Sequence, residues 1–106
     1  MFVILQKLVR VGVNMNNRII KMTANWCPPC KVMDKTVIQP LEARPNNNFD
    51  IVKVDIDLDE NKELVEEFAV RSIPTTIFLV DGEEVERVIG AVPLSQIDEI
   101  ITKVFN

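Results

Sequence analysis

The sequence predicts one α/β domain, built on a mixed central β-sheet with helices on its faces. Three observations support this fold class. The 106 residues are enough for one domain, spanning residues 1–106, and hardly enough for two. Segments typical of strands and helices follow one another in the order strand, helix, strand, helix, strand, strand, helix. No repeat or linker divides them.

The first strand and helix are predicted from apolar patterning. Residues 19–24 form a short apolar run typical of a buried strand, with Lys21 as its single charged residue. Residues 28–43 have apolar side chains at helical spacing, and Pro40 is expected to kink or interrupt that helix. Residues 1–17 match neither pattern, because a glycine and several asparagines interrupt both.

The middle of the chain predicts a second strand and helix. Residues 51–57 alternate strictly, with valines and Ile56 on one face. The opposite face holds the charged residues Lys53, Asp55 and Asp57. Asp59 is a candidate N-cap for a helix over residues 60–70, whose apolar stripe is formed by Leu64, Val65 and Phe68.

The C-terminal third predicts a hairpin followed by a helix. Residues 75–80 are rich in β-branched and aromatic side chains, and the Asp-Gly pair at 81–82 favours a tight turn into an antiparallel strand over 85–89. Ser95 and Asp98 resemble a capping box at the start of the last helix. Its apolar face is formed by Leu94, Ile97, Ile100, Ile101, Val104 and Phe105.

The composition excludes several classes of function. A net charge of −4 argues against a nucleic-acid-binding protein, which would show a basic face. The chain has no histidine, so it has no Ser-His-Asp triad, Cys-His dyad or histidine-containing zinc site. The apolar run over residues 1–5 is too short for a signal peptide, and no stretch is long enough to span a membrane. We therefore expect a cytoplasmic protein that does not associate with membranes.

The two cysteines, Cys27 and Cys30, lie where the first strand is expected to meet the first helix. The free N–H groups and partial positive charge of a helix N-terminus favour a thiolate over a thiol. Cysteines in such positions have pKa values of roughly 3.5–7.5 instead of about 8.5. Cys27 is therefore the predicted nucleophile and Cys30, one turn later, the resolving thiol of a dithiol–disulfide exchange.

Two prolines separate the cysteines. Pro28 and Pro29 have no N–H group, so the Cys30 N–H and the helix dipole are expected to provide most of the support for a Cys27 thiolate. Their fixed φ also suits a first helical turn.

Three other interpretations of the cysteine pair are open. A purely stabilising crosslink is disfavoured because so short a ring constrains little chain. Zinc needs four ligands, and this motif supplies two. Two inert core cysteines would not need a position at a strand-to-helix turn beside Trp26. We predict no bound metal and no bound cofactor besides a redox-active Cys27–Cys30 disulfide.

The motif Trp26-Cys27-Pro28-Pro29-Cys30-Lys31 resembles the W-C-G-P-C-K active site of thioredoxins. The segment 71–75, Arg-Ser-Ile-Pro-Thr, resembles the loop that holds that family's cis-proline, and the Asp-Gly turn and Gly90 lie where the family has equivalents. The resemblance runs from about residue 18 to the end and implies a thioredoxin fold whose N-terminal part is shortened or altered.

The resemblance implies roles for further residues. Pro74 would be cis and lie against the cysteines, leaving the Ile73 backbone to pair with a substrate strand; the alternative is a proline that simply begins a strand. Trp26 would be a partly exposed substrate contact, and the alternative is a core residue. Pro28 stands where the family usually has glycine. The resulting W-C-P-P-C motif also occurs in membrane-tethered or exported relatives, which usually carry a signal anchor.

A sharper departure concerns Lys21. It stands where thioredoxins have a buried aspartate that is thought to shuttle a proton, and Lys53 matches the lysine that normally pairs with it. Two lysines cannot share a buried pocket and both stay charged. Lys21 is therefore a neutral base, a lysine directed toward solvent, or the partner of Asp55 or Asp57. We hypothesise that it raises the thiolate character of the cysteine pair.

The predicted function is the reduction of protein disulfides by a small dithiol–disulfide oxidoreductase. Its partners would be disulfide-containing proteins and a thioredoxin-reductase-like recycling enzyme, and the chain would act as a monomer. The same thiols could serve a protein disulfide oxidant or isomerase, and a redox-inert binding module is the alternative from a different class.

Overall fold

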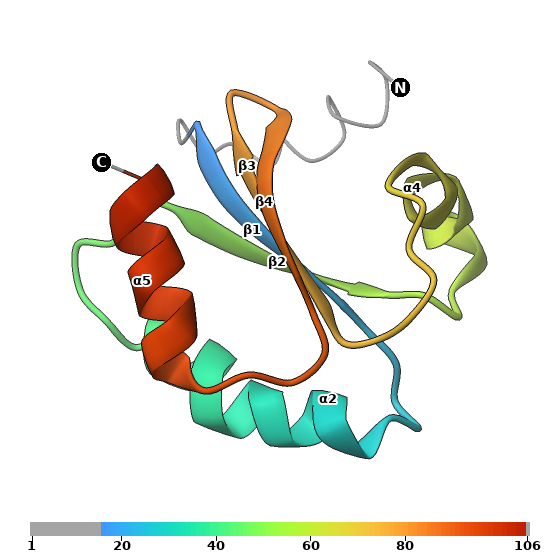
Figure 1. The fold of residues 1–106 in the computed structure, drawn as a ribbon. Coiled ribbons are helices and arrows are strands. Elements are labelled where there is room, and N and C mark those ends of the chain that lie inside the picture. The colour runs from blue at the N-terminus through green and yellow to red at the C-terminus, as the bar shows by residue number, and fades with distance from the viewer. Residues whose placement is uncertain (1–15, 106) are drawn as a thin grey trace.

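A four-stranded mixed sheet forms the centre of residues 16–105, the part of the chain that this computed structural model describes (Figure 1). Its strands are β1 (Asn17–Thr23), β2 (Asp50–Asp55), β3 (Thr75–Val80) and β4 (Glu83–Ile89), in the spatial order β2-β1-β3-β4. β1 pairs in parallel with β2 and antiparallel with β3, which pairs antiparallel with β4. The predicted fold class is confirmed. The expectations for residues 1–15 lie outside the described residues.

The helical segment after β1 is continuous but irregular. It consists of α2 (Pro28–Met33), a π-helical turn η1 (Asp34–Ile38) and α3 (Gln39–Glu42). A proline lacks the N–H that would bond to the preceding turn, and its ring crowds that turn's carbonyl groups. The wider π turn immediately before Pro40 accommodates both effects, so the predicted interruption is confirmed.

The predicted cap at Asp59 is wrong. A short 3₁₀ turn, η2 (Asp59–Asn61), precedes α4 (Lys62–Glu67), and neither has a side-chain cap. Leu58 holds the N-cap position of η2 in extended backbone, so Asp59 is already inside the turn. The α-helix is also shorter than the predicted range 60–70, because Ala69 leaves helical backbone with a φ of 51°.

The predicted capping box at Ser95 and Asp98 is wrong as well. The last helix, α5 (Leu94–Val104), begins two residues earlier than a cap at Ser95 requires, with Pro93 at its N-cap and no side-chain cap bond. Asp98 instead accepts two hydrogen bonds from the guanidinium of Arg44, with a shortest distance of 2.6 Å. This ion pair connects α5 to the end of the α3 segment.

Two apolar layers sandwich the sheet. The segment beginning with α2 and the helix α5 cover one face, and α4 covers the other (Figure 1). Ile19 packs in the first layer and Ile20 in the second, and both are fully buried, as expected for a central strand between two helical layers. The predicted apolar stripes of α4 and α5 face these layers.

The β3–β4 hairpin turns as the sequence predicts. Asp81 and Gly82 both have positive φ angles, 53° and 83°, which is the backbone that an Asp-Gly turn favours.

None of the helices between residues 16 and 105 has the length and apolar character needed to cross a bilayer.

Candidate active site

Cys27 occupies the N-cap position of α2, in extended backbone between the end of β1 and the first helical turn. Its Sγ accepts a hydrogen bond from the backbone N–H of Cys30 at 3.3 Å. Pro28 and Pro29 fill the first two positions of the helix, so the Cys30 N–H is the first donor available to the sulfur. This N–H is the group expected from the sequence to support a Cys27 thiolate, and it is directed at the Cys27 sulfur.

The two cysteines form a disulfide whose Cα atoms are 5.3 Å apart. Both are buried, in a small apolar cluster with Ala24 against which Ile56 and Ile73 pack. Pro28 and Pro29 are exposed beside them. Residues 16–105 contain no group of three or more acidic or cysteine side chains placed to hold a metal ion.

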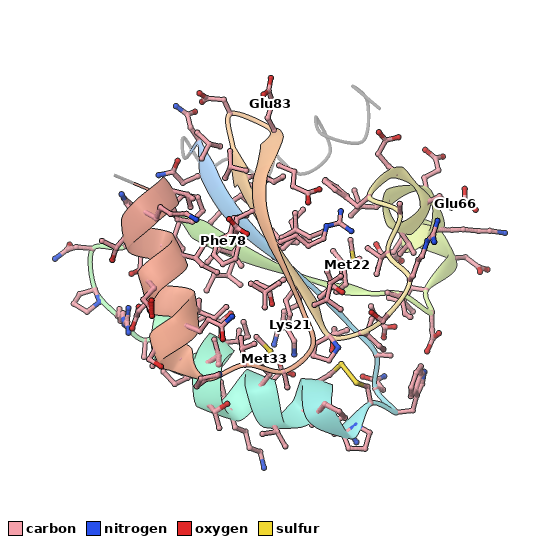
Figure 2. All side chains as sticks on the ribbon, in the orientation of Figure 1. Lys21, Met22, Met33, Glu66, Phe78 and Glu83 are labelled. Carbon is pink, nitrogen blue, oxygen red and sulfur yellow. A yellow bond between two sulfur atoms is a disulfide. The ribbon has the colours of Figure 1, made fainter. Side chains whose placement is uncertain are left out.

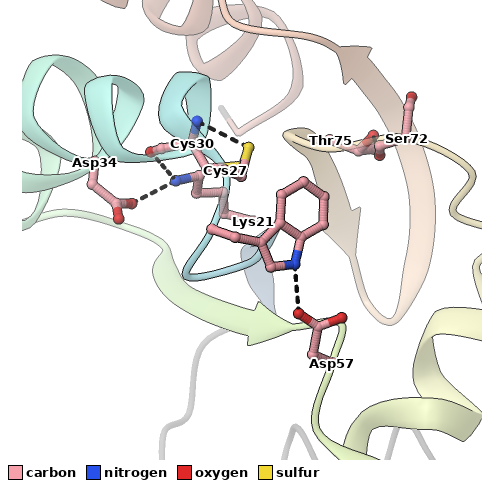
Figure 3. Close-up of a disulfide and its surroundings, with 8 residues drawn as sticks. Lys21, Cys27, Cys30, Asp34, Asp57, Ser72 and Thr75 are labelled. Atoms are coloured by element: carbon pink, nitrogen blue, oxygen red, sulfur yellow. Dashed lines mark hydrogen bonds and ion pairs between the residues drawn. A yellow bond between two sulfur atoms is a disulfide. The ribbon is translucent and has the colours of Figure 1, made fainter.

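The loop before β3 lies opposite the disulfide. The Ile73–Pro74 peptide bond is cis, so the cis-proline implied by the resemblance is confirmed. The Pro74 carbonyl accepts a hydrogen bond from the Gly90 N–H at 2.8 Å. The Ser72 carbonyl accepts one from the Thr75 hydroxyl at 2.7 Å, and Figure 3 labels both residues. Among the hydrogen bonds of the described residues, none uses the Ile73 N–H or carbonyl.

A groove of about 360 Å³ runs between the cysteine turn and this loop. Cys27 lines the groove and Cys30 does not. The remaining lining residues are mostly apolar and come from both sides: Trp26, Pro28, Pro29, Ile56, Val70, Arg71, Ser72 and Ile73. Of the two cysteines, Cys27 is therefore the one that can be reached from the groove.

Trp26 stands exposed at the edge of this groove, with 63% of its surface accessible, so the alternative of a core residue is wrong. Its indole Nε1 donates a hydrogen bond of 2.7 Å to Asp57, just beyond β2 (Figure 3). Asp57 thus orients the tryptophan and does not pair with Lys21.

Lys21 is completely buried, which excludes the prediction that it is directed toward solvent. Its Nζ donates hydrogen bonds to the carbonyl of Cys30 at 2.7 Å and to Asp34 Oδ1 at 2.5 Å (Figure 3). The predicted partners Asp55 and Asp57 are wrong: Lys21 pairs with Asp34, whereas Asp55 ends β2 and Asp57 follows that strand. Asp55 instead accepts the backbone N–H of Asp57 at 2.9 Å.

Lys53 does not share the Lys21 pocket. The two residues are direct partners across the parallel β1–β2 pair, but β2 is an edge strand and the Lys53 side chain is exposed. The conflict between two buried charges is therefore avoided. Asp34 is the site residue that sequence reasoning missed; the available signal was Lys21 itself, since a charge in an apolar strand requires a partner.

Comparison with known proteins agrees with this geometry. The family model described as Thioredoxin matches residues 6–103. The chain belongs to the thioredoxin family. It is 40% identical to a thioredoxin of Listeria monocytogenes over 80 residues, covering 76% of this chain and 75% of that one. It is 39% identical to a thioredoxin of Bacillus subtilis over 80 residues, covering 76% and 74%.

Solved thioredoxin structures share the fold. A mutant thioredoxin from Halobacterium salinarum has a TM-score of 0.76 at 27% identity, over 88% of this chain and 78% of that one. Thioredoxin NaTrxh from Nicotiana alata has a TM-score of 0.70 at 33% identity, over 85% and 75%. This thioredoxin-family protein is accordingly a thiol–disulfide oxidoreductase of the protein-disulfide reductase type. Such proteins act on protein disulfides and need no cofactor besides their redox-active disulfide.

Proposed function

We propose that Cys27 is the thiol that attacks substrate disulfides and that Cys30 resolves the resulting mixed disulfide. The observation that supports this order is access: Cys27 lines the groove, whereas Cys30 is fully buried behind it. The Cys30 N–H directed at the Cys27 sulfur favours a thiolate there once the pair is reduced.

The reaction transfers two electrons from the cysteine pair to the substrate. The Cys27 thiolate forms a bond to one substrate sulfur, and the other substrate sulfur leaves with the electron pair as a thiolate. The Cys30 thiolate then attacks Cys27 Sγ, closes the Cys27–Cys30 disulfide and releases the second substrate thiolate. Both released thiolates take protons from water, and the protons of the two protein thiols go to water.

The groove suggests how a substrate is held. An extended substrate segment would pair with the unused N–H and carbonyl of Ile73, in the manner of an added strand. Trp26 would cover the segment from the other side, and the apolar lining favours an apolar residue beside the substrate cysteine. Pro28 and Pro29 would keep the first turn of α2 rigid while the sulfur is attacked.

Insulin reduction tests this proposal directly. Reduced wild-type protein with excess dithiothreitol should accelerate the precipitation of insulin chains, and both Cys27→Ser and Cys30→Ser should lower the rate by at least about 100-fold. Absence of turnover by the wild type would instead favour a redox-inert binding module.

The reduction potential distinguishes a reductase from an oxidant or isomerase. We expect a value near that of thioredoxins, roughly −270 mV, instead of the value of about −180 mV typical of protein disulfide isomerase. Equilibration with glutathione, followed by quantification of the oxidised fraction, gives the potential. A reduction potential near about −180 mV would contradict the reductase assignment.

The cellular setting is part of the same proposal. A reducing compartment such as the cytoplasm, and a thioredoxin-reductase-like enzyme, would return the Cys27–Cys30 disulfide to the dithiol. The protein would act as a monomer and a single domain, because its groove is complete within one chain.

A further inference from the structure

An ion pair between a fully buried lysine and a partly exposed aspartate lies directly behind Cys30, the proposed resolving cysteine. Lys21 comes from the middle of β1, and its ammonium is held between the carbonyl of Cys30 and the carboxylate of Asp34 in η1 (Figure 3). Figure 2 shows Lys21 between the sheet and the helical segment. The Lys21 side chain has no exposed surface, whereas that of Asp34 is 28% exposed.

Thr76 on the neighbouring strand β3 adds a polar side chain on the same face of the sheet as Lys21. Thr76 is the direct partner of Lys21 across the β1–β3 pair, so both side chains point to the same face of the sheet. The Thr76 hydroxyl is buried and has no hydrogen-bond partner among residues 16–105. An ammonium has three N–H donors, and the described residues accept two of those of Lys21. One donor therefore remains unused beside the cysteine turn.

A buried ion pair is weak evidence for stability, since apolar residues of similar volume often serve a core as well. We propose that Lys21 is a positioning residue for the resolving step: its ammonium favours the thiolate form of Cys30, and Asp34 is the counter-ion that holds the ammonium in place. This inference rests on the proposed roles of Cys27 and Cys30.

The two charges of the pair do not cancel at Cys30. The ammonium is fully buried and bonded to the Cys30 carbonyl itself, so its field is poorly screened. The carboxylate lies at the outer side of the ammonium and is partly exposed, so water weakens its field. The net effect at Cys30 favours the negative form of the thiol.

The neighbouring charges do not replace this effect. Lys53 on β2 is exposed at the sheet edge, and Lys31 and Lys35 on the helical segment are exposed as well. β3 contributes only the hydroxyl of Thr76, and Asp57 is engaged with Trp26 outside this layer. Arg71 lines the groove on the Cys27 side, and Cys30 does not line that groove. Among the described residues, Lys21 and Asp34 are therefore the charged pair that contacts the Cys30 side of the disulfide.

In the resolving step, the proton of the Cys30 thiol goes to water and Lys21 keeps its own protons. The Cys30 thiolate then forms its bond to Cys27 Sγ, and the bond from Cys27 to the substrate breaks with its electron pair on the substrate sulfur. Lys21 acts before the electrons move, by increasing the fraction of Cys30 that is ionised.

Stopped-flow reaction of the reduced protein with a limiting amount of the aromatic disulfide dithiobis(nitrobenzoate) separates the two thiols. The first coloured thiolate reports attack by Cys27, and the second reports resolution by Cys30. In Lys21→Met the second phase should slow about ten-fold at neutral pH, and its pH profile should move up by about one unit. The first phase should change by less than about two-fold.

Lys35→Met, which removes an exposed lysine from the same helical segment, is the matched control and should leave both phases unchanged.

The double variant Lys21→Met/Asp34→Ala removes the carboxylate together with the ammonium. It therefore leaves no unpaired charge in the core and should be more stable than Lys21→Met alone. If it folds as stably as the wild type but resolves as slowly as Lys21→Met, the charge itself supports Cys30. A wild-type rate and pH profile in either variant would overturn the proposal and leave Lys21 a purely structural residue. Failure of the proposed function is distinguishable, because the wild type would then release no second thiolate.

Discussion

The exposed side chain of Trp26 makes one hydrogen bond to a distant segment. Its indole is exposed and its Nε1 bonds to Asp57 in a different segment, so this one hydrogen bond fixes the ring over the groove. The chain has no other tryptophan, so its fluorescence reports on this ring alone.

Asp57→Ala should free the indole without unfolding the protein. We expect lower fluorescence anisotropy and a higher KM for insulin, with a loss of stability below about 1 kcal/mol, because an exposed hydrogen bond contributes little to folding. Time-resolved anisotropy and insulin kinetics measure these effects. Asp59→Ala, an exposed carboxylate two residues away, is the control. Unchanged anisotropy in Asp57→Ala would show that other contacts hold the ring.

At the scale of elements, the helix ends differ from those that capping patterns predict. Pro93 holds the N-cap position of α5, so Ser95 lies inside the helix with no capping bond. Ser95→Ala should therefore change the free energy of unfolding by less than about 0.5 kcal/mol, instead of the loss of about 0.5–2 kcal/mol expected for a true N-cap. Urea unfolding of the two proteins measures the difference. A loss of about 0.5–2 kcal/mol would instead show that Ser95 does cap α5.

The ion pair between Arg44 and Asp98 should give α5 a small pH-dependent stabilisation. The hydrogen bond from Arg44 holds the pKa of Asp98 below its ordinary value of 3.8. The contribution is therefore complete at neutral pH and is lost as the pH falls through the folded-state pKa of Asp98. Both side chains are partly exposed, so it should not exceed about 1 kcal/mol.

Asp98→Asn should be slightly less stable than the wild type at neutral pH and equally stable at acidic pH. Urea unfolding of both proteins across this range, in low salt, gives the comparison. Glu99→Gln, an exposed acid that makes no ion pair in the described residues, controls for net charge. A difference that stays constant down to strongly acidic pH would mean that the pair does not stabilise the fold.

The strands were more predictable than the helix ends because their patterns are local. β3 begins and ends where its β-branched residues do, and the alternation of residues 51–57 indicated both faces of β2. Caps depend on where the preceding chain enters the helix, and neither Leu58 nor Pro93 offers a side-chain acceptor. A capping pattern alone could not show this.

The site was predictable where the chemistry lies within one turn of helix. The contact between Cys27 Sγ and the Cys30 N–H follows from their spacing, and the cis-proline from the resemblance of its loop. The Lys21–Asp34 pair joins residues from a strand and a helix, and it depends on how η1 lies across the sheet. The sequence marked Lys21 as anomalous but could not identify its partner.

At the scale of the whole molecule, the layer under α5 stabilises the fold without forming the groove. Ile97 is completely buried there, in the cluster that includes Ile19 and Phe78. Ile97→Ala should lower the free energy of unfolding by about 2–5 kcal/mol through the cavity it leaves. Its rate of insulin reduction per folded molecule should stay within about two-fold of the wild type. Denaturation curves and activity at low temperature measure both quantities; a folded but inactive variant would contradict this separation.

The central claim is that the fold makes Cys27 the attacking thiol and Cys30 the resolving thiol. Trapping of the mixed disulfide tests it most directly, with insulin as substrate and mass spectrometry of the adduct. Cys30→Ser should accumulate a covalent complex linked through Cys27, and Cys27→Ser should accumulate none. A stable complex linked through Cys30 in Cys27→Ser, formed as fast as that of Cys30→Ser, would contradict the claim.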